Sequence, residues 1–291
     1  MSATLFNFSK TTTVAMFISA GLLMSGCSDK DKPESPKPTA AAEIKPEVKS
    51  VTPATPSLAE RGVTLVDPPA SPVEDIDFYR VSTGLDVLYL FGANAPGGVD
   101  LKSAIGHIYT NYGDLSDKRL DALVKKYNDG DQFVKNDTAK EIGPVLQESA
   151  AKLSGTKYVV TDVQGPLSLG AYDFERHGYT VTNALKDKAG EDGTVPYTRP
   201  ALRYSDVMGY KLSFINASEL SFIEMPEDSA RKLNEYMKQG NLNFRLYGYL
   251  QSVAEDKSEN QRYVVMKIQK VELTSSTDSG DTPEVFYSYS I

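Results

Sequence analysis

The chain has 291 residues, 39 of them acidic and 31 basic, and a net charge of −8. This acidic balance opposes nucleic-acid binding, which needs a basic surface to displace the counterions of the phosphate backbone. It also opposes adhesion to anionic lipid through a basic patch. The chain holds two histidines and one cysteine, too few for a histidine-rich metal site, and we expect no metal and no cofactor.

Residues 1–26 form an apolar leader that ends at the only cysteine. Its run from Val14 to Met24 is too short to cross a bilayer, which takes about 20 apolar residues, and has the length of a signal-peptide core. Met24, Ser25, Gly26 and Cys27 then follow one another. This order resembles the lipidation box of bacterial lipoproteins, with methionine where leucine is usual. The alternative is an ordinary buried cysteine.

The resemblance implies that Cys27 receives a diacylglycerol thioether, that residues 1–26 are removed, and that the new amino terminus is acylated. Several acyl chains give stable membrane attachment, whereas one chain gives only marginal binding. Ser28 stands where an aspartate would resemble an inner-membrane retention signal, so we expect an outer-membrane lipoprotein that faces the periplasm. Asp29, one place later, keeps the inner membrane open as an alternative, and the cell surface is a further alternative.

Residues 27–60 are expected to be the lipidated terminus and a disordered tether. Loss of the leader leaves 30 basic and 39 acidic residues, a net charge of −9. The segment is rich in proline and lysine and nearly lacks large apolar residues, so it cannot bury enough surface to offset its ordering entropy. It is interpreted either as a tether that holds the domain away from the membrane or as a passive spacer.

Residues 61–291 are expected to form a single globular domain, and the first half of this region has helical spacing of its apolar residues. We expect helices from Gly84 to Gly92, from Asp100 to Ile108, after Ser116, and from Asp131 to Leu153. Ser82, Asp100 and Ser116 are the expected caps. Gly143 and Pro144 should break or kink the last helix, because proline cannot donate a backbone hydrogen bond.

The second half contains segments that alternate as strands do. Asn241 to Val253 and Arg262 to Leu273 should pair as an antiparallel hairpin, with a bulge near Gln269 or Lys270, where the apolar phase changes. A helix should begin at Pro226. The predicted fold class is α+β, with a helical N-terminal half packed on a mainly antiparallel sheet formed by the C-terminal half.

Leu167 to Tyr179 is the most distinctive stretch of the second half. In an extended chain, Asp173, Glu175 and His177 would share one face. Paired carboxylates can act as general acid and base, so these three residues are the candidate site of a hydrolase that acts on a cell-envelope glycan. The structural interpretation places Tyr172 and Phe174 in the core and pairs Arg176 with a carboxylate. His107 is interpreted as a helix-surface or core residue.

Residues 70 to 275 resemble a family of uncharacterised bacterial envelope domains. The resemblance is carried by the helical first half, the stretch around residues 172–176 and the closing strand, helix and hairpin. It implies no activity and no site. The sequence contains no Gly-x-Ser-x-Gly motif or other catalytic signature. We therefore expect a membrane-anchored, non-enzymatic binding or envelope-assembly module with an envelope protein or cell-wall partner; the alternative is the carboxylate-dependent hydrolase.

Overall fold

The computed structural model describes residues 57–69, 77–108, 114–186, 200–238, 240–276 and 283–291. Internal contacts divide the chain into residues 1–53 and 54–291, and every described residue belongs to the second unit. The predicted leader, Cys27 and most of the tether lie outside the described residues. The last tether residues form a turn in which the Arg61 amide donates to the Ser57 carbonyl at 3.1 Å. No helix in the described ranges is long and apolar enough to span a membrane.

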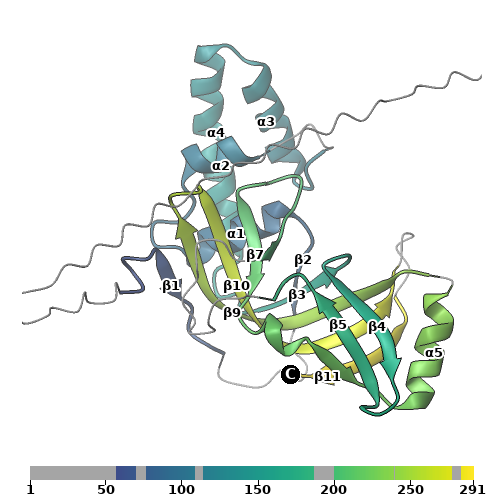
Figure 1. Ribbon diagram of the computed structural model, residues 1–291. Helices are drawn as coiled ribbons and strands as arrows, with labels where there is room; N and C mark the ends of the chain where they lie inside the picture. Colours follow the sequence, from purple (N-terminus) through teal and green to yellow (C-terminus); the bar gives the residue numbers. More distant parts are fainter. Residues whose placement is uncertain (1–56, 70–76, 109–113, 187–199, 239, 277–282) are drawn as a thin grey trace, which may run out of the picture. The chain divides into compact units, whose positions relative to one another are not determined.

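The described residues form five α-helices, one short 3-10 helix and eleven strands (Figure 1). The helices are α1 (Gly84–Asn94), α2 (Leu101–His107), α3 (Lys118–Asp129), α4 (Gln132–Lys152), α5 (Glu227–Met237) and η1 (Ala217–Glu219). The strands are β1 (Val63–Leu65), β2 (Tyr79–Val81), β3 (Tyr158–Val163), β4 (Leu167–Asp173), β5 (Gly178–Asn183), β6 (Ala201–Leu202), β7 (Tyr210–Phe214), β8 (Phe222–Glu224), β9 (Leu242–Asp256), β10 (Gln261–Ser275) and β11 (Val285–Ser290).

The strands are divided between two sheets. The eight-stranded sheet has the order β2-β3-β9-β10-β7-β6, with β1 paired to β9 and β11 paired to β10. It is mixed, because β2 runs parallel to β3 and β7 runs parallel to β10. The three-stranded sheet has the order β4-β5-β8. The long β9–β10 hairpin is therefore the element to which most other strands of the larger sheet attach.

The predicted arrangement of a helical N-terminal half on one C-terminal sheet is wrong. Strands β1 and β2 precede the helices in the sequence, yet both join the large sheet. The helices α1 to α4 lie in mid-chain, α5 lies among the strands of the second half, and the strands form two sheets instead of one. Strands of three residues carry too little alternation to show which distant strand they will pair with.

The helices themselves begin and end close to their predicted positions, but two caps differ. Thr83 caps α1 in a capping box with Asp86, and Asp117 caps α3, each one residue after the expected serine. Helix α4 continues through Pro144 instead of breaking there. Its buried residues on either side of the proline, Ile142 and Val145, hold it in the core, where it packs against α1 and α3.

The β9–β10 hairpin is confirmed, together with its bulge. The two strands pair antiparallel along nearly their whole length, and the register shifts between Ile268 and Lys270, where the bulge is predicted. A second shift lies between Val265 and Met266. The buried side chains change phase at the shift between Ile268 and Lys270. Ile268 and Val271 are both buried although they are three positions apart.

The main core lies between the helices and the large sheet and extends to the small sheet. Leu88 of α1, Leu146 of α4 and Phe244 of β9 belong to it and are almost inaccessible to solvent. Tyr179 of β5 is also buried there, and its hydroxyl donates to the Ala230 carbonyl of α5 at 3.1 Å. A smaller cluster, formed by Val63, Ala254, Tyr263 and Val265, lies where β1 meets the hairpin.

Candidate functional site

The predicted site residues, Asp173, Glu175 and His177, do not lie on one face of a strand. Residues 174–177 form the turn between β4 and β5, so the alternation assumed for an extended chain does not apply. Asp173 Oδ1 accepts the backbone N–H groups of Glu175 and Arg176, each at 3.0 Å, and His177 has a positive φ of 51°. The carboxylate of Asp173 therefore closes the turn, as aspartate commonly does at this position.

The aromatic side chains of this stretch follow the structural interpretation only in part. Tyr172 packs against the core, and its hydroxyl donates to the Met225 carbonyl at 2.9 Å. Phe174 is 68% exposed, so its predicted place in the core is wrong. Arg176 forms no ion pair with Asp173 or Glu175 among the described residues. Its guanidinium lies 3.7 Å from the centre of the Phe222 ring instead.

A different polar cluster lies where the β9–β10 hairpin turns. Arg262 Nη2 donates to Glu255 Oε1 at 2.8 Å, and Arg262 Nη1 donates to Asn260 Oδ1 at 3.1 Å. The guanidinium also lies 5.6 Å from the centre of the Tyr210 ring. Only 5% of the Arg262 side chain is exposed, against 33% for Glu255. Its charge is thus buried, paired and held in place.

The tight hairpin turn brings these groups together. Asp256 Oδ1 accepts from the backbone N–H groups of Ser258 and Glu259, and Asn260 has a φ of 51°. This left-handed conformation is one that asparagine tolerates better than most residues. The Arg262 amide then donates to the Gly209 carbonyl at 2.9 Å, so the start of β10 is attached directly to the start of β7.

His107, at the end of α2, extends the cluster. Its Nε2 lies 3.1 Å from Asn260 Nδ2, and its ring meets the Tyr210 ring edge-on, with centroids 6.2 Å apart. A side chain at Gly209 would bring its Cβ to within 2.3 Å of the imidazole, so only glycine leaves room for the ring. Burial, followed by the nearby Arg262 charge, lowers the pKa of His107. Burial raises the pKa of Tyr210 to about 12.

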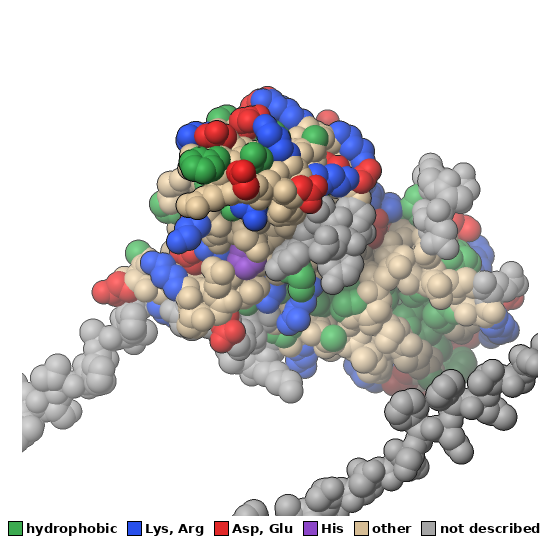
Figure 2. Space-filling view, turned by 90° about the horizontal axis from the view of Figure 1, so that it is seen from above, with side chains coloured by type: hydrophobic (Ala, Val, Ile, Leu, Met, Phe, Trp, Pro, Cys, Tyr) green, Lys and Arg blue, Asp and Glu red, His purple; other side chains and the backbone are tan. Residues whose placement is uncertain are grey.

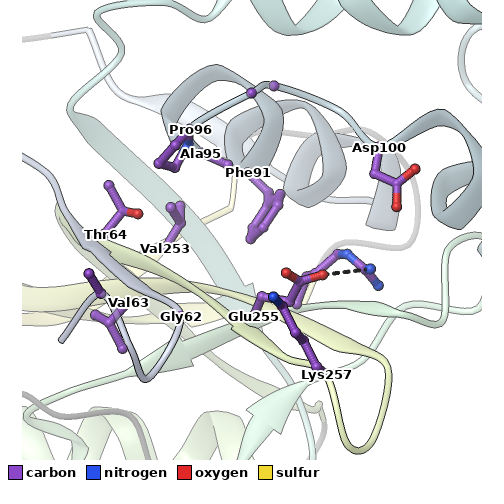
Figure 3. Close-up of a pocket in the computed structure, with 14 residues that line it drawn as sticks. Gly62, Val63, Thr64, Phe91, Ala95, Pro96, Asp100, Val253, Glu255 and Lys257 are labelled. Atoms are coloured by element: carbon purple, nitrogen blue, oxygen red, sulfur yellow. Dashed lines mark hydrogen bonds and ion pairs between the residues drawn. The ribbon is translucent and has the colours of Figure 1, made fainter. Parts of the chain in front are cut away.

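A pocket of about 390 Å³, here named the Arg262 pocket, opens beside this cluster (Figure 3). One wall is apolar and comes from Phe91 of α1 and the turn after it. The Phe91 ring points from the helix toward the end of β9, which carries Glu255, with Lys257 in the turn that follows (Figure 3). Asp100 lies at the far side; it caps α2, since its Oδ1 accepts from Lys102 N at 3.1 Å. The volume falls in the range of small-ligand sites.

The residues of this pocket suit recognition by hydrogen bonds more than metal chemistry. Within the described ranges, no group of three or more His, Cys, Asp or Glu side chains could hold a metal ion. The two carboxylates of the pocket are already engaged, Glu255 by Arg262 and Asp100 by the first turn of α2. The pocket thus offers fixed charges of both signs beside an apolar wall.

Comparisons with protein-family models, with curated proteins and with solved structures found no match for this chain.

The sequence does not show that Glu255 and Arg262 form a site with the residues around His107. Glu255 and Arg262 lie in one hairpin, far in the sequence from Asp100, and none of the three belongs to a short motif. One signal was available, because the predicted hairpin places the two ends of residues 254–260 side by side. Glu255 lies near one end of that segment and Arg262 just beyond the other, and opposite charges across a hairpin commonly pair.

Proposed function

We propose that this protein is a lipid-anchored, periplasm-facing binding module that holds a ligand in the Arg262 pocket without changing it chemically. The lipobox at Cys27 supports the anchor, and the proline-rich segment after it supports the tether. One observation favours binding over catalysis: Arg262 and Asp100, two charged residues of the pocket, are held by contacts within the fold. Arg262 is fixed by Glu255, Asn260 and Tyr210, and Asp100 caps a helix.

The ligand that fits has donors and acceptors along one side and an apolar patch on the other. The fixed guanidinium of Arg262 suits a carbonyl or carboxylate oxygen, and the free edge of the Glu255 carboxylate suits an N–H or O–H donor. Phe91 and Val253 supply the apolar contact. Peptide and glycan fragments of the cell wall have this combination, and they are present on the side of the membrane to which the anchor would direct the domain.

Native mass spectrometry of the full-length protein in detergent tests the proposal. Incubation with soluble cell-wall fragments should add the mass of an intact fragment. Thr64 of β1 lines the pocket, so Thr64→Trp should fill it and abolish the added mass. Leu65 is the next residue and is 58% exposed, so Leu65→Trp is a matched control that should bind normally. Cleavage of the fragments, or equal binding by Thr64→Trp, would contradict the proposal.

A further inference from the structure

A second pocket, of about 480 Å³, shares no lining residue with the Arg262 pocket. It lies where β6 ends and β7 begins, beside the end of α2. Arg203, Lys211 and His107 line it with Tyr204 and Gln261, and no acidic side chain is among its described lining residues. It is named here the basic pocket. In a chain with a net charge of −8, a pocket whose described lining includes two cations and no carboxylate is unexpected.

The strand register places the two cations together. Ala201 of β6 pairs with Ser213 of β7, and Leu202 pairs with Leu212. Arg203 directly follows the last of these pairs and Lys211 directly precedes its partner, and the Arg203 charge contributes to the lowered pKa of Lys211. Neighbouring like charges repel each other, and more strongly where they are partly buried. Something other than fold stability is therefore expected to account for this pair.

No carboxylate of the described residues forms an ion pair with either cation. Among the described residues, no ion pair involves Arg203 or Lys211, whereas the lysines of α3 pair with acidic neighbours, as Lys125 does with Asp121 at 2.8 Å. Over α3 and α4, acidic and basic side chains are interspersed (Figure 2). The Lys211 ammonium lies 5.6 Å from the centre of the Tyr263 ring, which does not cancel its charge.

Two acidic residues on segments next to this pocket already accept backbone hydrogen bonds. Asp206, in the loop between β6 and β7, accepts from the amides of Gly84 and Leu85 at the start of α1, at 2.8 and 3.1 Å. Asp256 is 1% exposed and closes the hairpin turn. Glu259 and Asp256 act on Lys211 in the opposite direction, but burial and then the Arg203 charge dominate and lower its pKa.

Neutral groups complete the lining. His107 contributes an imidazole with a lowered pKa, and the buried Oε1 of Gln261 has no hydrogen-bond partner among the described residues. A ligand that carries both an anionic group and a hydroxyl would satisfy the two cations and this acceptor together.

We propose that the basic pocket binds a phosphoryl anion attached to a hydroxyl-bearing group, with Lys211 and Arg203 as its two cationic contacts. A phosphate monoester carries about two negative charges at neutral pH and three acceptor oxygens, which matches two cations side by side. Two sources share this chemistry in a cell envelope: a soluble phosphate ester, and the phosphate headgroup of a lipid in the membrane to which the anchor would hold the chain.

Calorimetry of the full chain at low ionic strength tests the site, with inorganic phosphate and glycerol 3-phosphate as probes. Both should bind. Lys211→Gln and Arg203→Gln should each weaken binding by about tenfold, the value of one charge-assisted hydrogen bond. Lys211→Arg retains the charge and should bind within about threefold of the unmodified chain, by the same scale. Lys232→Gln, a solvent-exposed lysine on α5, is the matched control.

Vesicles of neutral lipid with and without phosphatidic acid, whose headgroup is a phosphate monoester, distinguish the sources, using the Cys27→Ser chain so that no lipid anchor interferes. Retention on anionic vesicles that Lys211→Gln abolishes would identify a headgroup; binding of the soluble esters alone would identify a soluble ligand. Either result supports the phosphoryl site. It would be overturned if no phosphate probe bound, or if Lys211→Gln and Arg203→Gln bound as tightly as Lys232→Gln. Binding in the Arg262 pocket is unaffected by either outcome.

Discussion

At the residue scale, Arg262 depends on Glu255. The guanidinium is buried, and Glu255 is its one carboxylate partner at ion-pair distance among the described residues. A buried charge that loses its partner is strongly destabilising, because the desolvation penalty is no longer offset. The exposed pair of Lys140 and Asp137 is the opposite case, since both side chains are about 70% exposed.

Glu255→Gln should therefore lower the free energy of unfolding by about 3 kcal/mol, the lower end for buried pairs, because Glu255 is one-third exposed. Asp137→Asn should change it by less than about 1 kcal/mol, as exposed pairs do. Chemical denaturation of the two variants measures both. Equal effects would show that the Arg262 ion pair is not part of the folded structure.

His107 makes the stability of the domain depend on pH. Its pKa is lowered in the folded state, so the unfolded chain binds the proton more readily. Stability should be undiminished above about pH 6.5, the ordinary histidine pKa, and should fall as the pH drops below it. The imidazole proton resonances of His107 should titrate with a midpoint below that value, and His107→Gln should remove this part of the pH dependence. A midpoint above it would contradict the buried placement.

At the element scale, the β9–β10 hairpin supports the rest of the fold. Phe244→Ala should cost about 3–5 kcal/mol, as truncation of a buried phenylalanine does. Phe174→Ala, in the β4–β5 turn, should cost no more than about 0.5 kcal/mol, because that ring is 68% exposed. Thermal or urea unfolding of the two variants gives the comparison. A small cost at Phe244 would mean that this face of the hairpin is not core.

The elements that the sequence predicts well are those whose pattern is local. Helices α1 to α4 and the β9–β10 hairpin carry long apolar periods, and even the bulge after Ile268 follows from a change of phase. Pairing between distant strands has no such local pattern, so the places of β1 and β2 were missed. The error at Asp173 to His177 has another cause. The segment has no internal proline or glycine, and the aspartate alone indicated a turn.

At the scale of the whole molecule, the domain should fold without metal or thiol chemistry. The Cys27→Ser chain has no cysteine, and the described residues contain no candidate metal cluster. Its thermal unfolding should be cooperative, and its midpoint should be the same with and without chelator or reductant. A clear fall of the midpoint in chelator would mean that a bound metal contributes to the fold.

The proposed location and the proposed function both rest on attachment through Cys27, and intact-mass spectrometry of the protein extracted from membranes tests it most directly. The account predicts a chain that begins at Cys27 and carries the mass of a diacylglycerol and one further acyl chain. The Cys27→Ser chain should lack that mass and leave the membrane fraction. A membrane-bound Cys27→Ser chain, or a mature chain with an unmodified Cys27, would contradict the account.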